Sequence, residues 1–342
     1  MKKSQRLAAV LLILLMLCGC SMPAAPNTVV LPQTPAENHT ESAPASAEPA
    51  QTTPETNAFH LEYEQTALPE PLSSVTALAM LEETLLLGGV SETGLALVRL
   101  TPEGRSEELP LPGSTEYLYA LCPDGAGGAW LLCGSLPKGY FDAFGNFRFL
   151  SQEPEGKLAL AHYDAAFALQ EIVLLQTLYT DRFFQLRRLD GGFCMMSASL
   201  LVRLDETGAE TARQSLDAKD GWSFAAMQET DGVLYALTRN FYGIELPELR
   251  KFTPDTLSAL ESDVCTSEIT GLGLRADGRL LMGNSEELFA YDTGSGETET
   301  LVRWQEIGAN VLTEQPWELE DGYLLFSPGD TSLQRLRRVP GQ

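Results

Sequence analysis

A tight-turn motif recurs along the second half of this chain at a nearly constant interval. Asp-Gly pairs begin at Asp190, Asp231, Asp277 and Asp321, which are 41, 46 and 44 residues apart. Asp-Gly supplies the backbone conformations that a two-residue β-hairpin turn needs. Each pair stands between two short apolar runs, and further short runs with their own turns follow before the next pair. A period of about 44 residues with four strands per copy is that of a β-propeller blade.

Six copies of this unit can be followed along the chain. They occupy residues 75–109, 117–175, 184–216, 222–260, 269–304 and 311–339, and the second copy is lengthened by an insertion at 135–157. The sixth copy ends after its third strand, and residues 59–69 have the character of the missing one. We therefore predict an all-β fold: a six-bladed β-propeller of four-stranded antiparallel blades, with the last blade closed by the N-terminal strand. Such closure removes exposed strand edges.

The N-terminus has the plan of a bacterial secretion signal. Residues 1–19 begin with basic residues and continue with an apolar core at 7–17, which is too short for a stable membrane span. The sequence LCGC that ends at Cys20 resembles the lipobox of bacterial lipoproteins. This resemblance implies lipidation of Cys20 and a chain anchored in the cell membrane, facing the extracytoplasmic side.

The segment after the lipobox lacks the residues of a folded core. Residues 20–58 contain seven prolines and no aromatic residue, and their charges are all acidic, so we predict a disordered tether. The propeller is then expected at 59–342. The formal net charge of the whole chain is −24. We do not expect nucleic acid as a partner, because phosphate binding needs clustered lysine and arginine.

The usual signatures of catalysis are missing from the sequence. There is no G-x-S-x-G turn, no phosphate-binding loop and no H-E-x-x-H motif. We interpret His60 and His162 as strand residues, and Trp130 as an aromatic that packs within its blade. The Asp-Gly pairs never meet the pattern of a calcium loop. The expectation is a protein that is not an enzyme, with no catalytic residue, no metal and no cofactor.

Four cysteines lie in the predicted propeller, at positions 122, 133, 194 and 265. None has the C-x-x-C spacing of a metal site. Cys122 and Cys133 flank one hairpin at unequal distances from its turn, so they should not face each other. We expect small, buried strand residues with free thiols.

Two loops depart from the repeat and are the predicted location of a binding site. Residues 135–157, between the second and third strands of blade two, contain five aromatic residues, and the corresponding loop of blade four spans 238–247. Exposed aromatic residues mark interfaces, whereas packing of an extra hairpin against its own blade would explain the insertion equally well. The candidate ligand-binding residues are Tyr140, Phe141, Phe144, Arg239, Asn240 and Tyr242.

A resemblance to a known family rests on the end of the fifth copy and the start of the sixth. Residues 301–311 (LVRWQEIGANV) and 319–326 (LEDGYLLF) look like the blades of Gram-positive lipoproteins in which a propeller precedes an extracellular solute-binding domain. The likeness extends over about sixty residues, besides the lipobox and the tether. This chain ends at Gln342, so we expect a free-standing propeller or a truncated relative of the fused form.

The leading expectation is a membrane-anchored extracytoplasmic lipoprotein whose propeller is a non-catalytic binding module for a protein, peptide or glycan. An accessory propeller of a solute-uptake system, working with transporter components, is the first alternative. A propeller lyase or glycosidase that uses carboxylates at the central channel is the second. We expect a monomer whose contact with the membrane is made by its lipid.

Overall fold

The computed structural model describes residues 59–340 apart from positions 83, 114, 136–138, 142–146, 150–156, 180, 217–220, 241, 244 and 266. The predicted signal, the tether and Cys20 lie outside the described residues, as does Phe144. In the part that is described, every element is a β-strand, and no helix is long and apolar enough to cross a membrane.

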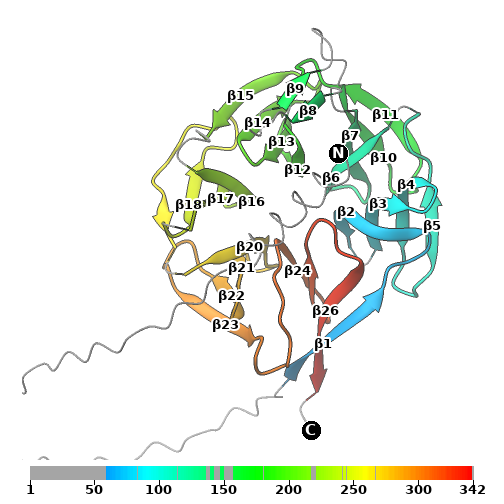
Figure 1. The fold of residues 1–342 in the computed structure, drawn as a ribbon. Helices are drawn as coiled ribbons and strands as arrows, with labels where there is room; N and C mark the ends of the chain where they lie inside the picture. The colour runs from blue at the N-terminus through cyan, green and yellow to red at the C-terminus, as the bar shows by residue number, and fades with distance from the viewer. Residues whose placement is uncertain are drawn as a thin grey trace, which may run out of the picture. The chain divides into compact units, whose positions relative to one another are not determined.

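Six four-stranded antiparallel sheets are arranged around a central axis, as Figure 1 shows. The predicted six-bladed propeller is therefore confirmed. Blade 1 consists of β2 (Leu72–Leu81), β3 (Thr84–Ser91), β4 (Gly94–Leu100) and β5 (Ser106–Leu109). Blade 2 consists of β6 (Tyr117–Pro123), β7 (Ala129–Gly134), β10 (Leu158–Tyr163) and β11 (Leu169–Leu174). Blade 3 consists of β12 (Phe183–Leu189), β13 (Gly192–Ser197), β14 (Leu200–Asp205) and β15 (Glu210–Ser215).

The other three blades follow the same order from the axis outward. Blade 4 consists of β16 (Trp222–Thr230), β17 (Val233–Asn240), β18 (Glu248–Phe252) and β19 (Asp263–Val264). Blade 5 consists of β20 (Ile269–Leu274), β21 (Leu280–Asn284), β22 (Glu287–Tyr291) and β23 (Thr298–Arg303). Blade 6 consists of β24 (Gln315–Leu319), β25 (Gly322–Phe326), β26 (Ser332–Pro340) and β1 (Phe59–Ala67).

The N-terminal strand completes the last blade, as predicted. β1 lies on the outer side of β26 and pairs with it antiparallel without a register shift, from Phe59 opposite Pro340 to Ala67 opposite Ser332. Leu61 and Tyr63 of β1 pack against the apolar cluster between blades 5 and 6. The two ends of the described chain thus close the ring together, and blade 6 has no unpaired outer edge at β26.

The position of a strand within its blade explains its sequence. The second strands of blades 2, 3, 5 and 6 are buried at every residue, because neighbouring blades cover both of their faces. They consequently read as almost continuous runs of apolar and glycine residues, such as AWLLCG in β7 and GYLLF in β25. The outer strand β15 alternates between half-buried and exposed residues, and its sequence ETARQS is mostly polar.

Packing between blades supplies six apolar clusters, one at each of the six blade interfaces. Trp130 lies in the cluster between blades 2 and 3, where its ring contacts that of Phe193 edge-on at 4.9 Å between centroids. The interpretation of Trp130 as a blade-packing residue is confirmed. Each fully buried large side chain contributes about 1.5–3 kcal/mol, so these clusters are the main source of stability of the ring.

Two glycines of β20 allow the inner strands of blades 5 and 6 to approach each other closely. A Cβ atom at Gly271 would lie 2.2 Å from the carbonyl oxygen of Thr313, and one at Gly273 would lie 1.9 Å from that of Pro316. Any side chain at these positions would therefore push β24 away from β20. The G-x-G spacing of this strand serves the packing of two blades.

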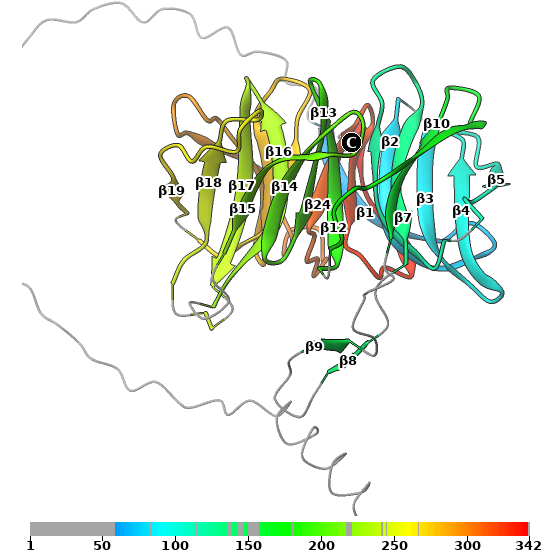
Figure 2. The ribbon, with the colours of Figure 1, turned by 90° about the horizontal axis from the view of Figure 1, so that it is seen from above.

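The insertion of blade 2 forms a small hairpin of its own. β8 (Gly139–Phe141) and β9 (Phe147–Phe149) pair antiparallel between β7 and β10, and Figure 2 shows this hairpin projecting from one face of the ring. All four cysteines of the propeller are free; Cys122, Cys133 and Cys194 are buried, and Cys265 is half-buried.

Candidate functional site

The two ends of the ring are built from different parts of each repeat. The Asp-Gly turns join the first and second strands of the blades, and they lie at what we call the turn end. The inner strands begin at the opposite end, together with the loops between second and third strands. We call this the funnel end, because a cavity of about 380 Å³ opens there between the inner strands.

A β-bulge near the start of the inner strand occurs in blades 1 to 5. At each of these bulges one residue of the inner strand has no partner on the second strand, and the bulged residues are Thr76, Tyr119, Phe184, Ala225 and Thr270. A bulge re-aims side chains that a regular strand would direct to the faces of the sheet. The bulged residues of blades 1 to 4 line the cavity, so this irregularity builds the funnel.

Residues from five of the six blades line the funnel. Its lining is Thr76, Leu118, Tyr119, Arg182, Phe183, Phe184, Phe224, Ala225, Arg239, Glu314, Pro328 and Gly329. Three of these side chains are charged, and the others provide an apolar and partly aromatic wall. Concave sites of this size, with a few polar groups on an apolar wall, are typical of ligand-binding sites.

The charged groups of the funnel have no partners in the part of the chain that the structure describes. Among the described residues, no hydrogen bond or ion pair involves the side chains of Arg182, Arg239 or Glu314. The hydroxyl of Tyr119 also lacks a partner in that part of the chain, although the side chain is only 3% exposed. A buried polar group without a hydrogen bond costs about 1–3 kcal/mol. The funnel therefore presents two guanidinium groups, a carboxyl group and a hydroxyl whose hydrogen-bonding capacity is unused.

Burial shifts the pKa values of the acidic groups at this end. Burial raises the pKa of Glu314; the charge of Asp330 adds to this rise, and the charge of Arg239 opposes it. Burial also raises the pKa of Asp330, against a hydrogen bond from the backbone of Ser327. The pKa of Tyr119 is raised by burial too, with Arg182 acting in the opposite direction. Both arginines thus act electrostatically on groups in or beside the funnel.

Local hydrogen bonds fix the segments that carry the two arginines. Asp181 accepts hydrogen bonds from the hydroxyl groups of Ser197 and Ser199, so the link before β12 is tied to the turn between β13 and β14. Arg239 is the second-last residue of β17 and lies opposite Ser223 of β16. The next residue, Asn240, accepts a hydrogen bond from the backbone N–H of Tyr242 at 3.0 Å.

The six predicted ligand-binding residues fall in three different settings. Arg239 lines the funnel, whereas Asn240 stabilises the loop that follows β17. Tyr242 belongs to the same loop and is 65% exposed. Tyr140 and Phe141 lie on β8, where the structure describes the backbone hairpin only, and Phe144 lies outside the described residues. The structure thus places one of the six in the funnel, and the role of the others stays a prediction.

Sequence reasoning missed most of the funnel residues. Tyr119, Arg182, Phe184 and Glu314 come from four separate stretches that share no motif. Their common signal is position, because each lies at the beginning of an inner strand or directly before it. That signal becomes visible once the strands of every repeat have been aligned on the Asp-Gly turns.

A histidine and an aspartate meet at the turn end of blade 2. His162 Nε2 lies 2.9 Å from Asp124 Oδ2, and the imidazole stacks on Trp130 with 4.4 Å between ring centroids. Asp124 Oδ1 also accepts hydrogen bonds from the backbone of Ala126 and Gly128. Burial opposes ionisation of Asp124, but these hydrogen bonds outweigh it and lower the pKa. The pair holds the turn against its blade.

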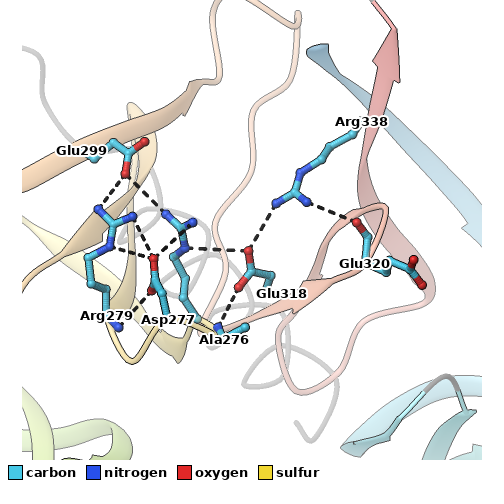
Figure 3. Close-up of polar contacts among 8 residues, drawn as sticks. Ala276, Asp277, Arg279, Glu299, Glu318, Glu320 and Arg338 are labelled. Atoms are coloured by element: carbon cyan, nitrogen blue, oxygen red, sulfur yellow. Dashed lines mark hydrogen bonds and ion pairs between the residues drawn. The ribbon is translucent and has the colours of Figure 1, made fainter. Parts of the chain in front are cut away.

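The turn end also carries an ion-pair network between blades 5 and 6, drawn in Figure 3. Arg279 contacts Asp277 at 2.9 Å and Glu299 at 2.6 Å. Glu318 accepts a hydrogen bond from the backbone of Ala276 at 2.8 Å, and its other oxygen faces Arg338 at 3.2 Å. Each of these charged side chains forms an ion pair, whereas no ion pair involves Arg182, Arg239 or Glu314 among the described residues of the funnel.

A larger groove of about 950 Å³ lies at the turn end, between blades 1 and 6. Its walls include the apolar side chains of Met80, Leu100 and Leu333, and Arg338 at its edge already donates to Glu318 and to the carbonyl of Glu320. The funnel is the better candidate site because it combines a cavity with unpaired charges. No group of three histidine, cysteine, aspartate or glutamate residues suited to a metal ion occurs within the described part of the chain.

The chain matches no protein-family model and no curated protein. Solved structures similar to it include virginiamycin B lyase from Staphylococcus aureus, with 8% identity, a TM-score of 0.48 and coverage of 82% of this chain and 100% of the lyase. A glucose dehydrogenase has 12% identity, a TM-score of 0.49 and coverage of 82% and 100%. The mitotic checkpoint complex has 11% identity, a TM-score of 0.48 and coverage of 90% and 99%.

These likenesses concern the fold, and they correct one expectation. The absence of catalytic motifs led to the prediction that the chain is not an enzyme, yet the similar structures include a lyase and a dehydrogenase. The physical reason is that a propeller brings residues of several blades to one axis, so reactive groups need no fixed spacing in the sequence. Function must be argued from the site, because a fold alone does not assign it.

Proposed function

We propose that this chain is an extracytoplasmic lipoprotein, anchored through lipid at Cys20, whose propeller binds a peptide or protein segment in its axial funnel. The observation that carries the proposal is the set of unpaired groups that converge on one cavity: Arg182, Arg239 and the buried hydroxyl of Tyr119. All three groups can donate hydrogen bonds to a carboxylate. The ligand that fits them carries a carboxylate at its leading end.

The remainder of the funnel suits the body of a peptide. Phe184 and Phe224 provide apolar surface, and the carboxyl group of Glu314 offers an acceptor for backbone N–H groups. Exposed apolar side chains lie around the same end of the ring, including Tyr117, Tyr242 and Leu312. They supply surface for residues of the ligand outside the funnel, because exposed apolar patches mark interaction sites.

Peptide libraries with two kinds of C-terminus test this assignment. The full-length chain is titrated with fluorescein-labelled hexapeptides that carry a free C-terminal carboxylate, and with the same peptides amidated. Fluorescence polarisation should show affinity for the free acids that is at least ~10-fold higher, since charge-assisted hydrogen bonds contribute about 1.5–3 kcal/mol. Equal affinity of both sets would contradict a carboxylate in the funnel. Selective binding of hexuronate oligosaccharides would correct the ligand class to a glycan.

Three variants locate the binding site. Arg182→Ala and Arg239→Ala should each weaken binding of the best free-acid peptide at least ~10-fold, and Tyr119→Phe should weaken it about 3–10-fold. Arg279→Ala at the turn end is the matched control and should leave affinity unchanged. A binding curve that none of the three funnel variants alters would exclude the funnel as the site.

The anchor is tested separately from the ligand. In bacterial cells that express the chain, Cys20→Ala should abolish incorporation of radiolabelled palmitate and release the protein from the membrane fraction. The support for this proposal is the basic and apolar signal at 1–19 that ends in the LCGC sequence. Palmitate incorporation that persists in the variant would refute lipidation at this cysteine.

A further inference from the structure

A second, much smaller cavity lies on the axis between the funnel and the turn end. Its volume is about 10 Å³, which is room for one species of atomic size. Apolar side chains of blades 1, 2 and 6 form part of its wall, and Gln185, Arg187 and Gln315 supply the polar part. Gln185 and Arg187 are two residues apart on β12, so their side chains leave the strand on the same side.

Arg187 is a cation without a counter-ion in the described part of the chain. No aspartate or glutamate there forms an ion pair with it, and its one hydrogen bond runs from Nε to the carbonyl oxygen of Met227 at 3.4 Å. Its guanidinium carbon lies 5.3 Å from the ring centre of Trp317, on the opposite side of the axis. Burial lowers the pKa of Arg187 to about 10, so the group is still charged at neutral pH.

The thiol of Cys122 cannot neutralise this charge. Cys122 acts electrostatically on Arg187, but burial raises the pKa of its thiol to about 12. The cysteine is therefore neutral at physiological pH, and the described residues offer the guanidinium no anionic partner. Arg187 is half-buried by its accessible surface, and removing an unpaired charge from water is unfavourable unless hydrogen bonds or an ion compensate it.

The same blade contains a buried arginine that is fully compensated. Arg203 of β14 donates to the carbonyl oxygens of Phe193 at 3.1 Å and Leu204 at 2.6 Å, and also to that of Asp190. Backbone carbonyls thus satisfy Arg203 within the protein. Arg187, which faces the axis, has one long contact in place of these three.

Gln185 directs a second donor group at the same cavity. Its Oε1 accepts a hydrogen bond from the backbone N–H of Met227 at 2.6 Å, which fixes the orientation of the amide. The Nε2 group therefore points away from Met227, and it has no acceptor among the described residues although the side chain is 3% exposed. A reversed amide would place two donors against each other.

From these contacts we infer that the small axial cavity is a binding site for one monatomic anion of the chloride class. An anion there accepts hydrogen bonds from Gln185 Nε2 and from the guanidinium of Arg187, and it neutralises the arginine. The size of the cavity excludes phosphate, sulfate and carboxylate ligands. The bound ion neutralises a charge and satisfies an amide donor of the folded state, so it stabilises the closed propeller. The site shares Phe184 with the funnel but does not depend on a ligand bound there.

Thermal unfolding in different sodium salts is the primary test. The melting temperature of the full-length chain is measured in sodium chloride and in sodium gluconate at equal ionic strength. Chloride at 150 mM should raise it by about 2–4 °C over gluconate, with saturation, as expected for an ion that binds the folded state with a Kd in the tens of millimolar. Identical melting temperatures in both salts would mean that the cavity holds water only, and would overturn the inference.

Three variants make the test specific. Arg187→Met removes the charge at similar volume and should abolish the difference between the two salts. Arg105→Met removes an exposed positive charge far from the axis and should preserve it. Gln185→Glu keeps the acceptor for Met227 and adds a carboxylate beside Arg187, so it should raise the melting temperature in gluconate and also abolish the chloride effect. A chloride effect that survives Gln185→Glu and Arg187→Met would contradict this site.

Crystals grown in sodium bromide provide a readout that needs no variant. Bromide scatters anomalously, and a peak between Gln185 and Arg187 in the unaltered protein would confirm an anion site even where a variant fails to fold. Density at that position without an anomalous signal would show water and overturn the inference.

Discussion

The funnel end and the turn end of the ring both carry arginine and glutamate side chains, but these differ in whether they form ion pairs. At the turn end, Arg279 and Arg338 each lie within 3.2 Å of a carboxylate oxygen, and Glu318 also accepts a backbone hydrogen bond. At the funnel end, Arg239 and Glu314 have no such contacts among the described residues. The charges at the turn end hold neighbouring blades together, and the charges of the funnel are those on which the proposed ligand site rests.

The geometry of the inner strands explains why the two ends differ. Each inner strand of blades 1 to 5 is bulged near its start, at the funnel end. Bulges turn side chains such as Tyr119 and Phe184 toward the axis and leave a cavity between the strands. At the turn end the hairpins are regular, and an ion pair there can form within a turn, as between Asp277 and Arg279.

Removal of β1 should have the largest effect on stability, because it weakens blade 6, which contributes residues to both ends of the ring. Blade 6 carries Glu314 at one end and Glu318 at the other, and its outer strand is β1. Deletion of residues 59–67 removes the hydrogen bonds to β26 and the contacts of Leu61 and Tyr63, and it exposes a strand edge. We expect a loss of at least ~4 kcal/mol, measured by urea unfolding followed by circular dichroism.

Deletion of residues 21–29, which belong to the predicted tether and leave Cys20 in place, is the control of equal length and should leave the unfolding midpoint unchanged. An unaltered midpoint after deletion of 59–67 would show that the ring does not need its closing strand.

The same substitution at the two ends should give different stabilities. Glu318→Gln removes the carboxylate that lies 3.2 Å from Arg338 and 3.7 Å from Arg275. The side chain of Arg275 is 17% exposed and that of Arg338 is 36% exposed. The expected loss is about 1–2 kcal/mol, between the values for exposed and buried pairs. Glu314→Gln removes a carboxylate that has no hydrogen-bond or ion-pair partner among the described residues, so it should be neutral or slightly stabilising. Equal losses at both ends, measured by urea unfolding, would break the comparison.

The pH dependence of stability should have opposite signs at the two ends, and this is the smallest effect. The folded pKa of Glu314 is raised by burial, so its contribution to stability is present at low pH and is lost as the pH rises from about 4.3 through the raised value. The folded pKa of Asp277 is lowered by its hydrogen bond with Arg279, so its contribution is present above about 3.9 and is lost as the pH falls.

Unfolding of two variants between pH 3 and pH 8 checks these signs. Relative to the unaltered protein, Glu314→Gln should become more stable as the pH rises, whereas Asp277→Asn should become less stable. Parallel curves for the two variants would contradict the assignment of unpaired burial at one end and ion pairing at the other.

The sequence was sufficient for the architecture but not for the site. Asp-Gly turns at a nearly constant period predicted the blades, and the missing fourth strand of the last copy predicted β1 at its outer edge. The turns are local features of the sequence, and the missing strand follows from the number of strands in each copy, so both can be recognised without the tertiary structure. The ligand site was predicted in the loops of blades 2 and 4, and of those residues Arg239 lines the funnel.

What the sequence determined by itself is the repeat: strand order, blade number and the apolar runs that become second strands, because turn chemistry and hydrophobic pattern act over short distances. The tertiary structure decided which residues face the axis. Tyr119 and Phe184 reach the funnel through bulges, and Arg187 meets Trp317 across the ring because closure places blade 3 opposite blade 6. Ring closure itself was predicted, but no local pattern in the chain encodes which residues it brings together across the axis.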